Sequence, residues 1–313
     1  MQKTARIVAP SAHALQMARV RKRKNALMAL AFLLPALLIY GLFNGYSVIM
    51  TLYYSLMSWT GISQSMSFIG LDNYIKLLQG GSDIWRALGN NLLLVVVSLA
   101  VQLPFGLILA LIINAKIAGM RFFRTVFFMP MLLSTVATGI LWNLMYDPNF
   151  GLINKVLQQV GLKFLARPWI GSSQSAIWAV MFVICWQYTP QYMILLRAGL
   201  TNIPEDLYEA AKIDGASGWR QFLSITLPML SPTIKTSATL SLVGSLKYFD
   251  LIYVLTGGNQ KTDVMATYMY KRGFQEFNMG YASSVAGFMF LISLVCVAVF
   301  QSATSKGQEG EGK

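Results

Sequence analysis

Charged residues divide this chain into long apolar stretches separated by short polar segments. Five stretches contain no charged residue: 25–71, 87–115, 125–146, 168–196 and 277–305. A sixth stretch, 222–249, contains only Lys235 and Lys247 as charged residues. Because a membrane-spanning helix needs about 20 mostly apolar residues, each stretch can hold one. The pattern therefore predicts an all-α, polytopic membrane protein with six transmembrane helices.

The expected bounds of these helices follow from where polar residues interrupt the apolar stretches. We expect them at residues 26–56, 87–113, 123–145, 175–197, 229–249 and 282–303. The chain then consists of a basic cytoplasmic arm (1–24), a transmembrane domain (25–303) and a disordered cytoplasmic tail (304–313). Only 12% of residues are charged, about half the usual share of a soluble domain, and this supports the membrane prediction.

The net charge of +13 has a membrane explanation. Seven Lys and Arg residues and no acid precede the first apolar stretch, so the rule that positive loops stay inside places the N-terminus in the cytoplasm. Six spans then return the C-terminus to the cytoplasm as well. A signal peptide would have a shorter apolar region and a small-residue cleavage site. We therefore expect lipid as a partner and no nucleic acid.

Few residues offer catalytic or metal-binding chemistry. Cys185 and Cys296 both lie in apolar stretches and are expected to be free thiols. His13, the single histidine, belongs to the basic arm. An intramembrane enzyme would need a nucleophile with a base, or a metal cluster, and the predicted spans supply neither.

The polar segment 198–222, between the fourth and fifth predicted spans, has the pattern of a short amphipathic helix. Pro204 suits a first helical turn, and the acids Glu205 and Asp206 favour the positive end of the helix dipole. The spacing i, i+3, i+4, i+7 puts four residues on one face: Leu207, Ala210, Ala211 and Asp214.

The same segment contains signals for a turn and a second helix. Gly215 is expected to end the first helix in a left-handed conformation, and Ser217 to cap the next one. Ala210 and Ala211 leave little side-chain bulk, so another surface can approach closely. The pattern by itself is equally consistent with an ordinary amphipathic connector.

A resemblance separates these two interpretations. Glu209-Ala210-Ala211, three residues, Gly215, nine residues, Ile225, one residue and Leu227-Pro228 resemble the EAA loop of bacterial ABC importer permeases. In that family the loop is the coupling helix, which docks into a groove on the cytoplasmic ATPase subunit. The resemblance implies that ATPase coupling depends on Glu209, Ala210, Ala211, Asp214 and Gly215.

The similarity extends over about residues 25–300. Residues 146–154 resemble the external loop after the third span of sugar permeases related to the maltose and glycerol-phosphate systems, and residues 249–258 resemble the end of their fifth span. One departure is that Asn259-Gln260 stands where family members often have Gly-Pro. The resemblance implies a type I importer permease fold in the bacterial inner membrane, with a carbohydrate as cargo.

The resemblance also implies the partners. They are a second homologous permease in a heterodimer, two ATP-binding-cassette ATPase subunits and an extracytoplasmic solute-binding protein. The sequence has no Gly-x-x-x-x-Gly-Lys-Ser/Thr segment, so we expect no ATPase activity and no cofactor in this chain, with ATP and Mg²⁺ bound by the ATPase subunits.

Candidate cargo contacts concentrate in the fourth span. Around Pro190 it carries Trp186, Gln187, Tyr188, Gln191 and Tyr192. Aromatic faces beside amide and hydroxyl groups suit a sugar, although an aromatic belt with a proline bend has the same composition. In the fifth span, Lys247 and Asp250 are three residues apart and can pair on one helix face. Lys235 can extend to the cytoplasmic interface. Weaker candidates are Asn90, Asn91, Asn143 and Ser245.

Two alternatives remain open at this level. The lysines of the fifth span also suit glycerol-phosphate or another polar, anionic solute. A secondary transporter is the rival of a different class; it usually shows inverted repeats and a coupling-ion site. The sequence shows no internal repeat, and its spans contain few acids.

Overall fold

The computed structural model describes residues 12–79, 81–114 and 119–309, with the side chains of 12–20, 26 and 305–309 left out of the description. It divides into two compact units, 1–53 and 54–313. The basic arm is described from residue 12 onward, where it is helical, and its first eleven residues lie outside the described part.

The first unit is one long helical stretch. It consists of α1 (Ala12–Tyr40), a π-helical turn (Gly41–Gly45) and the start of α2 (Tyr46–Ser55). Large apolar side chains are exposed all around it, for example Phe32 and Phe43 at 86% and 69%. A helix that is apolar on every side is typical of a membrane environment. The stretch Arg21–Ser55 is long and apolar enough to be the first predicted span.

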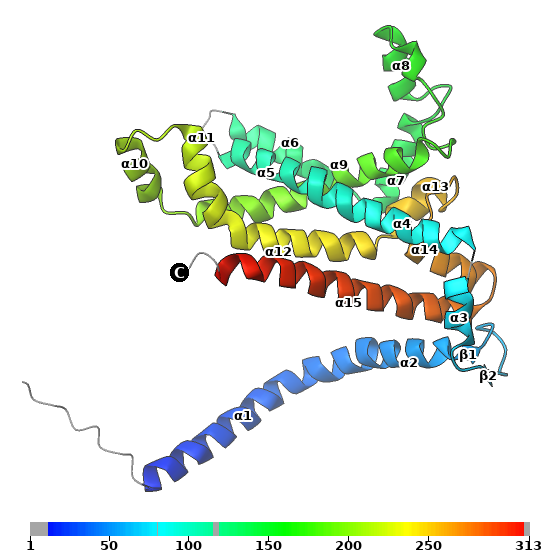
Figure 1. Cartoon of the computed structure of the whole chain (residues 1–313), viewed down its shortest axis with the longest axis horizontal. Coiled ribbons are helices and arrows are strands. Elements are labelled where there is room, and N and C mark those ends of the chain that lie inside the picture. The colour runs from blue at the N-terminus through cyan, green and yellow to red at the C-terminus, as the bar shows by residue number, and fades with distance from the viewer. Residues whose placement is uncertain (1–11, 80, 115–118, 310–313) are drawn as a thin grey trace, which may run out of the picture. The chain divides into compact units, whose positions relative to one another are not determined.

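In the second unit, three of the predicted spans are continuous helices. The second span comprises α4 (Ser82–Val97), a π-helical turn (Ser98–Gln102) and α5 (Leu103–Asn114). The fourth is α9 (Ala176–Thr201) and the sixth lies within α15 (Met279–Glu309). Figure 1 shows these helices running along one common direction. Among the described residues, these three helices and the first span are long and apolar enough to cross a membrane. Two further pairs of helices are bent, and counting each pair as one span brings the number to six.

The third span is broken, so the prediction of one helix over 123–145 was wrong in this respect. α6 (Met120–Leu132) and α7 (Thr135–Met145) meet at an angle of 99°. Ser134 is extended, and its side chain accepts a hydrogen bond from the Ala137 amide at 3.2 Å, which starts a new helix. The buried Gln187 donates to the Leu133 carbonyl at 3.2 Å and satisfies a backbone group that the break leaves open.

The fifth span begins earlier than the predicted residue 229. α11 (Gly218–Gln221), a π-helical turn (Phe222–Thr226) and α12 (Leu227–Leu246) form one continuous stretch. Lys247 ends it, and α13 (Asp250–Thr256) follows with a bend of 43°. α12 packs against α4, α9 and α15, so it lies at the centre of the second unit.

Shorter elements gather at the two ends of these helices (Figure 1). One end has α10 (Glu205–Ile213), α11 and the end of α15. The opposite end has the antiparallel strands β1 (Met57–Ser58) and β2 (Ser67–Phe68), then α3 (Asp72–Gln79) and α14 (Met265–Tyr270). The connection from α7 to α9 contains α8 (Leu152–Gln159) and a 3-10 turn (Lys163–Leu165). In the predicted orientation the α10 end is cytoplasmic and the α14 end is external.

The predicted disordered tail from residue 304 was also wrong for the residues that are described. α15 continues through Glu309, and residues 310–313 lie outside the description. The Lys235 ammonium donates to the Thr304 carbonyl at 2.9 Å and so ties the end of α15 to α12. Lys235 thereby extends toward the α10 end, as the sequence indicated, with a helix carbonyl as its partner.

Candidate coupling loop and translocation path

α10 is attached to the rest of the molecule at two points. Ile203, just before the helix, is buried in the apolar cluster formed by the ends of α5, α9 and α12. The Tyr208 hydroxyl lies 2.9 Å from the Thr226 hydroxyl at the start of α12. Every residue of α10 is exposed or half-buried. The helix is therefore positioned by its flanks, and most of its own surface is left uncovered.

The turn after α10 has the predicted geometry. The Ala216 amide donates to the Ala211 carbonyl at 2.8 Å, and the Gly215 amide to the Lys212 carbonyl at 3.1 Å. This pair of bonds is the Schellman motif, which needs a left-handed residue. Gly215 supplies it with φ +75°, and no described atom would lie within 4 Å of a Cβ placed there. Position 215 therefore requires glycine because of its left-handed backbone conformation. Steric crowding by neighbouring atoms is not the reason.

The open face of this loop is more apolar than the sequence motif indicated. Leu207, Ala210 and Asp214 are exposed, and Ala211 is half-buried. Ile213 and Trp219, which the sequence reasoning missed, are 87% and 69% exposed. Their signal was available, because large apolar residues inside a polar cytoplasmic loop are unusual. An uncovered apolar surface of this kind indicates contact with a partner protein or with the membrane surface.

Glu209 faces a different direction from the alanines that follow it. It lines a cavity of about 680 Å³ between α10 and the ends of α5 and α9. Glu205, Lys212 and Thr226 line the same cavity. Of the five predicted coupling residues, Ala210, Ala211 and Asp214 therefore belong to the face of α10, Gly215 to its turn and Glu209 to the cavity behind it. Their coupling role stays a prediction.

The predicted cargo contacts on α9 do not share one surface. Trp186 is half-buried, packs edge-on against Trp142 and lines an apolar cavity of about 530 Å³ between α5, α6 and α9. The Gln187 side chain donates its hydrogen bond to the Leu133 carbonyl at the break between α6 and α7. Tyr192 is buried beside Gly106 of α5, where a larger residue would contact it. Tyr188 packs edge-on against Tyr248, and Gln191 is half-buried. Trp186 alone of these residues lines the apolar cavity.

Lys247 and Asp250 do not pair on one helix face. Lys247 ends α12 and Asp250 begins α13, so no continuous helix carries both. Both side chains are exposed, and within the described residues no ion pair joins them. The expectation of an ion pair was wrong because the span bends between the two positions.

The asparagines prove to be structural links between helices. Asn91 is fully buried and donates to the carbonyls of Ser245 and Leu246 at 2.9 and 3.2 Å, while its oxygen accepts from the Met265 amide at 2.8 Å. It thereby joins α4 to the end of α12 and to the start of α14. Asn90 donates to two carbonyls of the neighbouring loop, at 2.7 and 2.8 Å. Asn143 makes a longer bond of 3.5 Å to the Val254 carbonyl.

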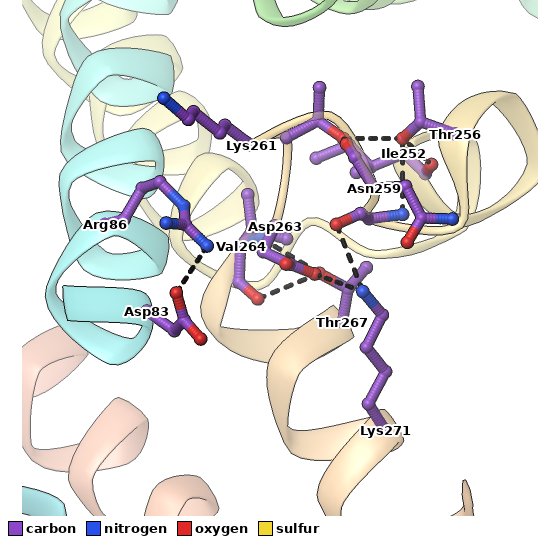
Figure 2. A network of polar contacts seen from close by, with 12 residues as sticks. Asp83, Arg86, Ile252, Thr256, Asn259, Lys261, Asp263, Val264, Thr267 and Lys271 are labelled. Carbon is purple, nitrogen blue, oxygen red and sulfur yellow. Dashed lines mark hydrogen bonds and ion pairs between the residues drawn. The ribbon is translucent and has the colours of Figure 1, made fainter. Parts of the chain in front are cut away.

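The loop between α13 and α14 is held by a dense polar network (Figure 2). The Lys271 ammonium lies 2.9 Å from the Asp263 carboxylate and donates to the Gly258 carbonyl at 3.1 Å. The hydroxyls of Thr256 and Thr262 are 2.6 Å apart. Gly258 has φ +70°, and a Cβ there would overlap the Asp263 carboxylate. The outer loop is therefore a fixed structure with little room for change.

Asn259-Gln260, which stands where family members often have Gly-Pro, lies in a part of this loop with an unusual backbone conformation. Gln260 and Lys261 both have positive φ, at +54° and +63°. Proline fixes φ near −65°, so it cannot adopt the conformation found at position 260. The loop of this chain therefore differs in backbone from one that carries Gly-Pro at positions 259 and 260.

Six membrane spans, an apolar cavity among the helices and a structured loop with an uncovered apolar face define a multi-pass membrane transport component that works with a partner. Residues 102–308 match the family model described as binding-protein-dependent transport system inner membrane component. Because the match covers well over half of the chain, the protein belongs to this family, and its place is a bacterial-type inner membrane.

Individual relatives agree with this assignment. A probable ABC transporter permease protein of Pyrococcus horikoshii is 35% identical, over 93% of this chain and 100% of its own length. The multiple sugar-binding transport system permease protein MsmF of Streptococcus mutans is 34% identical, over 92% of this chain and 98% of its own. A crystal structure of a bacterial ABC transporter involved in the import of the acidic polysaccharide alginate has a chain with 26% identity. That chain superposes with a TM-score of 0.80, covering 92% of this chain and 99% of its own.

Proposed function

We propose that this chain is the membrane-spanning permease subunit of an ABC importer and forms part of the pathway for a carbohydrate. The observation that carries the proposal is the uncovered apolar face of α10 and α11, at the predicted cytoplasmic end of the second unit of a chain of this family. The carbohydrate assignment is supported by the named cargoes of two relatives, multiple sugars and alginate.

The proposed complex contains a second homologous permease, two ATPase subunits and a solute-binding protein outside. ATP and Mg²⁺ belong to the ATPase subunits, so this chain has no ATPase site and no cofactor of its own. The face with Ala210, Ala211 and Asp214 seats in a groove of one ATPase subunit, with Ile213 and Trp219 at its edge. Closure of the ATPase pair then moves α10, and with it the ends of α9 and α12 that hold Ile203 and Thr226.

The test uses two exposed residues whose replacement should leave the fold intact. Ile213→Asp combined with Trp219→Asp places charges in an interface that must lose its water, and such contacts typically dominate binding energy. In proteoliposomes containing all subunits, we expect ATP hydrolysis stimulated by the binding protein, and sugar uptake, to fall about tenfold or more.

The matched control is Ile62→Asp, because Ile62 is 72% exposed and lies between β1 and β2, at the end of the second unit opposite α10. We expect it to keep both activities. Equal activity of the double variant and the wild type would overturn the coupling role of this loop. Uptake that continues in vesicles without any ATPase subunit would instead favour a secondary transporter.

A further inference from the structure

Four aromatic rings form a connected cluster at the external end of the bent fifth span. Phe249 and Tyr253 of α13 stack with centroids 5.1 Å apart. Tyr270 of α14 contacts both, at 5.4 and 5.0 Å. Phe274, one turn later, stacks on Tyr270 at 5.2 Å. These four residues are called the outer aromatic cluster below.

The exposure of the outer aromatic cluster distinguishes it from ordinary core packing. Phe274 is 58% exposed, and Phe249, Tyr253 and Tyr270 are half-buried. In contrast, Trp142 and Tyr146 form a ring pair inside the second unit that is 6% and 4% exposed. A cluster needed only to join α13 to α14 would bury its rings as that pair does. The outer aromatic cluster instead leaves ring surface uncovered.

Polar side chains accompany the exposed rings. The Tyr270 hydroxyl donates a hydrogen bond to the Tyr253 hydroxyl, and the loss of this bond on ionisation raises the pKa of Tyr270; the two hydroxyls therefore lie close together at the edge of the cluster. Asp250 lies between Phe249 and Tyr253 in the sequence and is exposed on α13. The exposed Lys247 comes two residues before Phe249.

This combination matches the chemistry of a sugar. A pyranose has one face of C–H groups, which packs on an aromatic ring, and a rim of hydroxyls, which needs hydrogen-bond donors and acceptors. A flat ring with polar groups at its edge satisfies both parts, whereas an anion site would require several donors converging on one point. The hydroxyls of Tyr253 and Tyr270 supply such polar groups here, and the exposed Asp250 and Lys247 belong to the same segment as Phe249.

We propose that the outer aromatic cluster is an external sugar subsite, on which a sugar ring stacks against Phe274 and Tyr270 as it leaves the binding protein. The proposal rests on the proposed carbohydrate function. It adds a position at which cargo is held before it enters the path between the helices. Sugar that is not captured there returns to the external solution while ATP is still hydrolysed.

The test replaces a ring by an apolar side chain of similar size. Phe274→Leu keeps a hydrophobic group but removes the flat face, and the exposed position makes misfolding a small risk. In proteoliposomes with every subunit, we expect the amount of labelled sugar imported per ATP hydrolysed to fall about three- to tenfold, the range typical of one aromatic contact. Radiolabelled maltotriose and an alginate trisaccharide serve as the neutral and acidic probes.

Two further variants complete the experiment. Phe274→Trp keeps a flat ring and should retain the wild-type ratio. Phe277→Leu is the matched control, because Phe277 is 51% exposed in the same segment, outside the outer aromatic cluster. We expect it to leave the ratio unchanged.

Other results separate the competing explanations. An unchanged ratio in Phe274→Leu overturns the subsite. Phe274→Leu could instead need a higher concentration of binding protein for half-maximal ATP hydrolysis while the ratio of sugar to ATP stays unchanged. That result would assign Phe274 to docking of the binding protein, and it would also overturn the subsite. If the wild type imports neither probe nor any other sugar tried, the carbohydrate function itself fails, and the subsite fails with it.

Discussion

Asn91 shows how a residue suggested by its polarity for cargo binding can be fully occupied by structure. Its amide makes three hydrogen bonds to backbone groups from two different segments, the end of α12 and the start of α14, and none of its surface is exposed. A buried polar group that loses its partners costs about 1–3 kcal/mol. The residue therefore contributes to stability, and the carbonyls that it binds are those that α12 leaves open where it ends.

The first prediction concerns this residue. Asn91→Ala leaves buried backbone groups without partners, so we expect the free energy of unfolding to fall by about 2–4 kcal/mol. Thermal unfolding of the purified protein in detergent measures the change. Asn143→Ala removes a single 3.5 Å bond and should cost less than about 1 kcal/mol. Equal shifts for both variants would contradict the assigned role of Asn91.

The second prediction uses two neighbouring glycines of the outer loop. Both have positive φ, but only at Gly258 would a Cβ overlap the Asp263 carboxylate. Gly258→Ala should therefore disrupt the Lys271–Asp263 ion pair, while Gly257→Ala carries only the backbone cost of about 1 kcal/mol. We expect trypsin added from outside to cleave at Lys261 about tenfold faster in Gly258→Ala. Equal cleavage rates would show that the network does not hold the loop.

Sequence reasoning worked at residue positions where the backbone alone decides the outcome. The left-handed Gly215 and the cap at Ser217 were predicted because both follow from local chemistry. Gln187 and Asn91 were not, because their partners lie 54 and more than 150 positions away in the chain. A polar residue in a span signals a partner, and the sequence does not say whether the partner is cargo or backbone.

At the scale of elements, the broken third span is the largest difference from the expected helices. Residues 125–146 have the apolar pattern of one straight span, and hydropathy does not register a change of direction. Ser134 followed by Thr135 is a start signal for a new helix, but such pairs also occur within continuous spans. The bend depends on a long-range contact, because Gln187 of α9 donates to the Leu133 carbonyl that the break leaves without a helical partner.

The third prediction tests that break. Ser134→Ala removes the cap of α7, so we expect a loss of about 1 kcal/mol in the free energy of unfolding. Ser134→Thr keeps a side-chain oxygen, so its free energy of unfolding should remain within a few tenths of a kcal/mol of the wild-type value. Thermal unfolding in detergent gives both values. A neutral effect of Ser134→Ala would mean that packing against α9 and α13 alone determines the bend.

For the whole molecule, hydropathy and charge predicted six spans and the motif of the α10 loop predicted the family, while the arrangement of the helices depended on long-range contacts. The apolar stretches located the first, second, fourth and sixth spans to within about five residues, but missed the break in the third span and the early start of the fifth. The packing of α12 at the centre of the second unit was not predictable, because all spans are about equally apolar. The outer aromatic cluster was also missed, since its rings come from segments about 20 residues apart.

The fourth prediction concerns orientation across the membrane. Single cysteines replace Ile62 or Ile213, both largely exposed, in a background where Cys185 and Cys296 are alanine. In intact cells, a membrane-impermeant maleimide should label the protein with Ile62→Cys and leave the one with Ile213→Cys unlabelled. Permeabilised cells should show labelling of both. The reverse pattern in intact cells would place α10 outside and contradict coupling to an ATPase.

The continuous stretch from α11 to α12 has a mechanical consequence. It covers residues 218–246 without interruption, which at 1.5 Å per residue is a rod of about 40 Å. One end adjoins α10, and the other is tied to Asn91. A tilt of about 10° pivoting at either end displaces the far end by about 7 Å, more than the width of a pyranose ring. If the ATPase engages at the α10 end, as proposed, a small rotation there moves the external end of this rod by more than the width of one sugar unit.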